Sequence, residues 1–408
     1  MKSLQAILTA FISVLIGWAV YNAFNAETDI ITDASDKDAS YQTSVEVIEA
    51  RIKRELEKDD APDFKAAEED IARLLRKAPL NDDGLFYHAQ SLIKQKDWQR
   101  FDPEIFSTIQ SRNPRNRKNL RTFLNHSVSL GNWSAVLEIL DRLYRLERDE
   151  REPQIGLLST IYTLQSGQAE IDKKLAENPS WGKPFIDAAV MEADGNSNAP
   201  LRKSLLVFME AAPQKTDMFK AAERLIRKTL GLGLISEAYN LWQDITALSG
   251  GERLNQETLN YNAEFARKAS PPPFNWVFPA YKGLIVDFET QGIFISFLGD
   301  QKRTVASQYY IPKSGPTTLS IKAQYNYNNR QGMFSVNTRC LAPVQAPFVI
   351  ALDDTQRGQD NIVQTLPSHE PPCELAVLHI TAQPGVFSER ITANFQSISV
   401  TQTEAATP

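Results

Sequence analysis

Residues that commonly carry catalysis or bind metals are sparse in this chain of 408 residues. Its 2 cysteines exclude a zinc cluster built from cysteines, and it contains no GxxxxGK[ST], GxSxG or HExxH motif. The 4 histidines show no metal-ligand spacing: His88, His126, His369 and His379. We interpret the acidic pair Asp353-Asp354 as a turn, with calcium binding and a glycosidase-type role as alternatives. The sequence therefore predicts no catalytic residue, no metal site, no cofactor and no enzyme.

Cys340 and Cys373 both lie in the C-terminal part of the chain. In an oxidising compartment we expect them to form a disulfide, which closes a loop of about 34 residues and is worth roughly 3–4 kcal/mol. The alternative is a pair of buried thiols.

One basic cluster and two aromatic residues are candidate binding residues. The cluster suits anionic lipid, anionic polysaccharide or an acidic partner, and the alternative is a solvated loop that runs into a helix: Arg112, Arg115, Arg117, Lys118 and Arg121. Tyr310, on the strand face opposite Val305 and Tyr309, is a candidate for stacking on a sugar ring. Trp276 is a second candidate, with packing between the helical and β parts as its alternative.

Residues 1–26 predict a transmembrane anchor. Lys2 precedes an apolar run over 4–24 without charge, and a helix of that length spans the roughly 30 Å hydrocarbon core. An acidic linker follows over 27–40, so the protein is expected to cross the inner membrane once, with a cytoplasmic N-terminus and its bulk in the periplasm. The alternative is a cleaved signal peptide, although Phe24 makes a poor cleavage site after Ala26.

Residues 41–270 show the 3.6-residue period of amphipathic helices. One apolar stripe lies between 64 and 77, before Pro79, and a helix over 41–58 is expected to cap the stack or to pair with a partner helix. Features recur about 35 residues apart, as in Asp97-Trp98 and Asn132-Trp133. Such a period in helix pairs is the signature of tetratricopeptide repeats. A generic α-α superhelix is the alternative, since Val136 stands where these repeats usually have alanine.

Specific residues carry the resemblance to tetratricopeptide proteins. Gly131-Asn132-Trp133 resembles the turn between the two helices of a repeat, and Gly233, Ala238 and Trp242 resemble its glycine, small and bulky positions. The resemblance implies an α-α solenoid whose groove binds protein partners.

The period changes to two after the proline linker 271–273, and the fraction of charged residues falls by about half. Alternating runs begin near Leu284, Ile321 and Phe334, so residues 274–402 predict an antiparallel β-sandwich, with a tail over 403–408. The segment 308–321 and the ending 393–400 resemble the jelly rolls of carbohydrate-binding modules. The expected fold is thus multidomain α and β.

The whole plan resembles membrane-anchored tetratricopeptide-repeat-like envelope proteins of alphaproteobacteria, some linked to exopolysaccharide production and export. This resemblance implies a periplasmic adaptor or scaffold for protein partners. The alternatives are a glycan-binding protein that uses the sandwich to bind polysaccharide, and a hydrolase with a site where the helical and β parts meet. The net charge of −6, from 44 basic and 50 acidic residues, argues against a nucleic-acid partner.

Overall fold

The structure is a computed structural model. It describes residues 45–58, 62–78, 81–95, 108–109, 111–195, 198–252, 254, 258–266, 269–313, 315, 317–325, 333–352, 361–366, 372–384 and 390–402. The predicted anchor 1–26, the acidic linker 27–40 and the tail 403–408 lie outside these residues. Within the described part, no helix has the length and apolar character needed to cross a membrane. The chain divides into two compact units, Met1–Phe185 and Ile186–Pro408.

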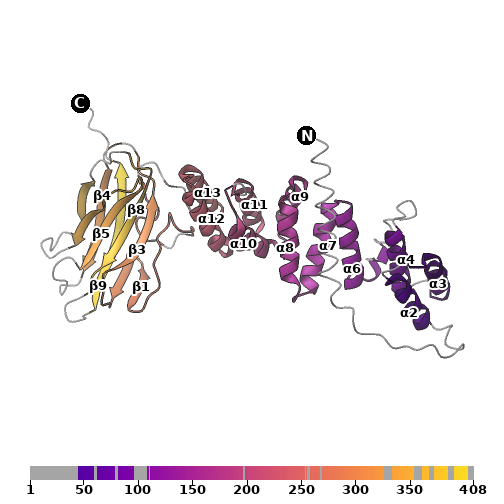
Figure 1. The fold of residues 1–408 in the computed structure, drawn as a ribbon. Helices are drawn as coiled ribbons and strands as arrows, with labels where there is room; N and C mark the ends of the chain where they lie inside the picture. Colours follow the sequence, from indigo (N-terminus) through magenta and orange to yellow (C-terminus); the bar gives the residue numbers. More distant parts are fainter. Residues whose placement is uncertain are drawn as a thin grey trace. The chain divides into compact units, whose positions relative to one another are not determined.

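The first unit is helical (Figure 1). Its described helices are α2 (Val45–Leu56), α3 (Phe64–Lys77), α4 (Asp82–Gln95), α6 (Arg117–Ser129), α7 (Trp133–Leu146), α8 (Arg151–Tyr162) and α9 (Gln165–Leu175). The predicted stripes form the contacts between them: Ile48, Ile52 and Leu56 of α2 are buried in one cluster with Ala67, Ile71 and Leu74 of α3. Burial of these side chains stabilises the unit, since each isoleucine or leucine contributes about 1.5–3 kcal/mol.

The turn between α6 and α7 lies where the sequence predicted it. Gly131 has φ +65°, which a glycine adopts without strain, and Asn132 then begins α7 by accepting the Ala135 N–H at 3.2 Å. In α7 the buried residues recur with helical spacing, among them Val136, Leu140 and Leu143.

The second unit combines helices with the β region. Its helices are α10 (Gly182–Glu192), whose first turn belongs to the first unit, α11 (Asn198–Ala211), the 3₁₀ turn η2 (Lys215–Met218), α12 (Phe219–Gly231) and α13 (Ile235–Leu248). Gly233 has φ +77° in the turn between α12 and α13. Ala238 of α13 is fully buried, as expected for a small residue where two helices approach closely.

Nine strands are described in the β region: β1 (Leu284–Glu289), β2 (Gly292–Phe297), β3 (Arg303–Tyr310), β4 (Thr317–Tyr325), β5 (Phe334–Ala342), β6 (Phe348–Leu352), β7 (Ile362–Leu366), β8 (Leu375–Ala382) and β9 (Ile391–Gln402). They form two antiparallel sheets, with strand orders β1-β2-β9-β4-β7 and β3-β8-β5-β6. The two sheets share one core, in which Phe334 of β5 meets Phe395 of β9 with ring centroids 5.9 Å apart.

A segment that we call the strap, residues 258–266 and 269–278, ties α13 to this β region. Its backbone hydrogen-bonds to β9, where the Leu259 N–H donates to the Val400 carbonyl at 2.8 Å. Trp242 of α13 is fully buried, and its Nε1 donates to the carbonyl of Pro271, the first residue of the proline triplet, at 3.0 Å. Its ring also packs on Phe274, with centroids 5.4 Å apart.

Candidate functional site

Neither aromatic residue that was predicted to contact a sugar is accessible. Tyr310 is 2% exposed and Trp276 is 7% exposed, and both belong to the core of the β region. The Tyr310 hydroxyl hydrogen-bonds to the Thr338 hydroxyl at 2.7 Å, and burial raises the pKa of Tyr310 to about 12. Trp276 packs on Phe265 at 4.9 Å and donates from Nε1 to the Asn262 carbonyl at 3.1 Å. Both side chains therefore belong to the core of the β region, and neither ring is exposed for stacking on a sugar as the sequence predicted.

A β-bulge explains why the exposed face of β3 was misassigned. The register with β8 shifts between Thr304 and Ala306, which makes Val305 the extra residue of the bulge. Val305 and the next residue, Ala306, are therefore both buried. Beyond the bulge, Tyr310 lies on the inward face and Tyr309 on the outward face. A single shift of this kind exchanges the two faces of all later residues in a strand.

The predicted basic patch is divided between the surface and the interior. Four members are exposed around the start of α6: Arg112, Arg115, Arg117 and Lys118. The Arg117 guanidinium donates a hydrogen bond to the Leu146 carbonyl at 3.4 Å, so the exposed part of the patch lies beside the end of α7.

The fifth member, Arg121, forms an ion pair with a buried carboxylate. Its Nη2 lies 3.0 Å from Glu147 Oε1 and 3.5 Å from Glu150 Oε1, and the Glu147 side chain is 1% exposed. Gln154 donates to the other Glu147 oxygen at 3.2 Å. Burial raises the pKa of Glu147 above its ordinary value, and the charge of Arg121 opposes that rise. We assign Arg121 a structural role, because two carboxylates already occupy its guanidinium.

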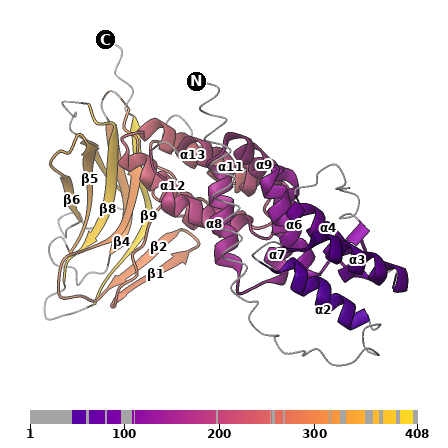
Figure 2. The ribbon, with the colours of Figure 1, turned by 45° about the vertical axis from the view of Figure 1, so that its right-hand side comes forward.

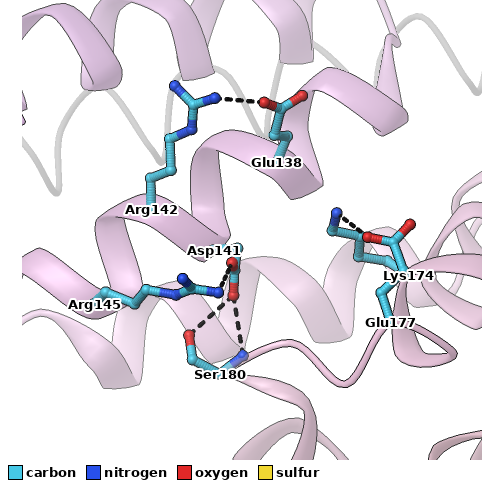
Figure 3. A network of polar contacts seen from close by, with 7 residues as sticks. All are labelled: Glu138, Asp141, Arg142, Arg145, Lys174, Glu177 and Ser180. Carbon is cyan, nitrogen blue, oxygen red and sulfur yellow. Dashed lines mark hydrogen bonds and ion pairs between the residues drawn. The ribbon is translucent and has the colours of Figure 1, made fainter. Parts of the chain in front are cut away.

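Figure 3 shows another set of polar contacts in the first unit. Asp141 on α7 accepts hydrogen bonds from the Ser180 N–H at 3.0 Å and the Ser180 hydroxyl at 2.9 Å. These bonds fasten the segment before α10 to α7. Three ion pairs lie beside them: Arg145–Asp141 at 2.5 Å, Arg142–Glu138 at 2.6 Å and Lys174–Glu177 at 2.5 Å. Ion pairs at the surface contribute about 0–1 kcal/mol each, so their main effect here is to orient the turn before α10.

A groove lies between α11 and α13. It has a volume of about 670 Å³, within the range of ligand and peptide sites. Its floor includes Leu206 and Val207 of α11 and Leu248 of α13, which are half-buried. We call it the α11–α13 groove, and it is lined by Ala199, Arg202, Lys203, Leu206, Val207, Glu210, Asp244, Ala247 and Leu248.

Charges are distributed unevenly along the α11–α13 groove. Arg202 and Lys203 lie in the first half of α11, whereas Glu210 lies near its end. At 1.5 Å per residue, the basic and acidic positions are about 10–12 Å apart. Asp244 adds a carboxylate on the α13 side. The groove thus combines an apolar lining with basic side chains toward the start of α11 and an acidic side chain near its end.

The outward face of the five-stranded sheet carries a second candidate site. Phe294 of β2 is half-buried on this face, since its neighbours Ile293 and Ile295 are in the core. One cross-strand row contains Asp287, Phe294, Asn394 and Gln324. A ring flanked by amide and carboxylate groups is the combination that a sugar needs for stacking and hydrogen bonding.

The disulfide predicted from the two cysteines is confirmed. Cys340 at the end of β5 and Cys373 just before β8 have their sulfurs 2.06 Å apart. Within the described part of the chain, no three His, Cys, Asp or Glu side chains converge as metal ligands do. The pair Asp353-Asp354 lies outside the described residues.

No family model matches this chain, and no curated protein is similar to it. Its function must therefore be inferred from its own residues.

Sequence reasoning missed the α11–α13 groove, although one signal was present. Helix α11 has apolar residues on two faces: Leu205, Phe208 and Met209 are buried, whereas Leu206 and Val207 line the groove. An amphipathic helix with a single apolar stripe facing the core would carry polar residues at positions 206 and 207. Phe294 was missed because it stands between two apolar residues, Ile293 and Ile295, and three consecutive apolar residues hide the alternation of faces.

Proposed function

We propose that this protein is an adaptor that binds an apolar segment of a protein partner in the α11–α13 groove. The groove itself is the observation that carries the proposal, because half-buried leucine and valine side chains line an open hollow between two helices. Laying an amphipathic helix into such a groove is a recurring mode of peptide recognition. The partner segment would present apolar residues three and four positions apart, an acidic residue toward Arg202, and a basic residue toward Glu210.

The finer architecture is part of the same proposal. We take the helix pairs as a tetratricopeptide-like solenoid. We take the β region as a jelly roll, which the strand orders β2-β9-β4-β7 and β3-β8-β5-β6 support, with β1 as an added edge strand. The disulfide supports an exported location, because oxidising compartments preserve such bonds. An anchor over 1–26 would hold the adaptor at the inner membrane, in an envelope assembly such as one for polysaccharide export.

Two matched substitutions on α13 test the groove. Ala247 lines it and Asn240 does not, and both are exposed, so either position accepts an arginine without disturbing the core. Proteins retained by the full-length chain from detergent-solubilised membranes are quantified for wild type, Ala247→Arg and Asn240→Arg. We expect Ala247→Arg to weaken retention by about tenfold or more and Asn240→Arg to leave it unchanged. Equal retention by all three would contradict a role for the groove.

Glycan binding by the outward face of the five-stranded sheet is the second candidate function. The row of Asp287, Phe294, Asn394 and Gln324 favours it. Replacing Phe294 with alanine removes the ring and is expected to weaken binding of envelope polysaccharide by about tenfold, since a stacked ring is worth about 1 kcal/mol or more. The matched control is Val363→Ala on β7, an exposed valine of the same sheet. Unchanged binding in Phe294→Ala would exclude this site.

A further inference from the structure

The edge strands of the two sheets are protected unequally. Strand β3 is covered by the strap, because Val277 and Ser307 exchange backbone hydrogen bonds at 2.8 and 3.0 Å. Strand β1 carries two exposed acidic residues, Asp287 and Glu289. A paired backbone and charged side chains are two ways in which proteins prevent edge strands from associating.

Within the described part of the chain, strand β6 has neither form of protection. Figure 2 shows it at the edge of its sheet, and among the described residues only β5 pairs with it. Its sequence FVIAL contains no charge and no proline. Val349 is 51% exposed on the outward face, and Val344 just before the strand is 76% exposed. An open edge of strongly β-forming residues is a template for another strand.

We propose that β6 pairs with β6 of a second copy of this chain, antiparallel and about a two-fold axis at Ile350. This register places Val349 opposite the partner's Ala351, and Phe348 opposite the partner's Leu352. A two-fold interface must be self-complementary, and this one sets large side chains against smaller ones with no like charges facing each other. The same pairing at β1 would gather the acidic residues of both copies. The four-stranded sheet becomes a continuous sheet across the two copies.

The uncharged strand β7, at one edge of the other sheet, provides the comparison. Its residues Ile362–Leu366 include Gln364 and Thr365, and its exposed valine is Val363 at 62%. Because polar residues replace apolar ones at its centre, self-pairing gains less there than at β6. Val363 therefore serves as a matched control for Val349.

Disulfides between engineered cysteines test the proposed β6–β6 register directly. Facing positions of an antiparallel pair have Cα atoms about 5 Å apart, whereas Val349 and the partner's Val349 would be about 8 Å apart, too far for a disulfide. Full-length chains with Val349→Cys and with Ala351→Cys carry different tags and are produced together or singly. We expect disulfide-linked dimers to form several-fold more in the mixture than with either variant alone. Equal linkage in all three preparations, or linkage in none, would overturn the proposal.

A charge at the same edge gives the second readout. Light scattering of the full-length protein in detergent measures dimer mass for Val349→Lys and for Val363→Lys. We expect Val349→Lys to raise the dimer dissociation constant by about tenfold, because a lysine on an edge strand disfavours pairing with another strand, and Val363→Lys to leave it unchanged. Equal effects of both variants would move the contact away from β6 and contradict the proposal.

Discussion

Glu147 is a buried carboxylate of the first unit that forms an ion pair with Arg121. It is 1% exposed, and Arg121 supplies the charge that opposes the rise of its pKa. Replacing Arg121 with alanine leaves this carboxylate buried and unpaired, so we expect the free energy of unfolding at pH 7 to fall by about 1–3 kcal/mol. Urea denaturation of the full-length protein measures the loss.

The pH dependence of this loss has a definite sign. A carboxyl whose pKa is raised in the folded state stabilises the fold least when it is ionised, so the penalty appears as the pH rises above its unfolded pKa. We therefore expect Arg121→Ala to cost less near pH 4 than at pH 7. Glu147→Gln provides the control, since adding Arg121→Ala to it should cost little at either pH. A cost that does not change with pH would show that Arg121 acts by packing alone.

The alternation of residues predicted the inward face correctly on one strand and wrongly on another. Alternation places Phe334, Val336 and Cys340 on the inward face, and all three are buried. The same reasoning failed at Tyr310, because one extra residue at the bulge beside Val305 exchanges the faces. No residue type marks that bulge in the sequence, so a pattern of period two could not reveal it.

At the scale of elements, the disulfide joins β5 to the start of β8 across 33 residues. Closing a loop of that length restricts the unfolded chain, so we expect the double variant Cys340→Ser with Cys373→Ser to lower the free energy of unfolding by about 2–4 kcal/mol. Chemical denaturation with and without a reducing agent measures this difference.

The double serine variant also supplies its own control. It should no longer respond to the reducing agent, whereas the wild-type protein should lose a similar amount of stability when reduced. Wild-type protein that keeps its full stability after reduction would contradict a stabilising role for the Cys340–Cys373 bond.

Helices and strands could be predicted from the sequence where their buried residues lie on a single face. The helix from Phe64 to Lys77 was found within its predicted limits, because its apolar stripe is continuous and Pro79 follows. The α11–α13 groove could not be predicted, because it depends on how two helices far apart in sequence are spaced. The apolar residues of α11 are consistent with both a core face and a binding face.

At the scale of the whole chain, the change in composition and the boundary between the two compact units fall at different residues. The charged fraction falls near residue 270, whereas the two compact units meet between Phe185 and Ile186. Aromatic packing explains the difference within the second unit, since the Trp242 ring of α13 contacts Tyr261 and Phe274 of the strap at 5.2 and 5.4 Å. The last helices therefore belong to the same compact unit as the β region.

The central claim, that the α11–α13 groove holds a protein partner, is tested most directly by a photo-crosslinking residue at Val207. Val207 lines the groove, and the same residue at the exposed position Asn240 serves as the control. The account predicts one discrete adduct with another protein from position 207 in membranes, lost when Ala247→Arg is added, and no such adduct from position 240. The same adduct from both positions, or none from position 207, would contradict it.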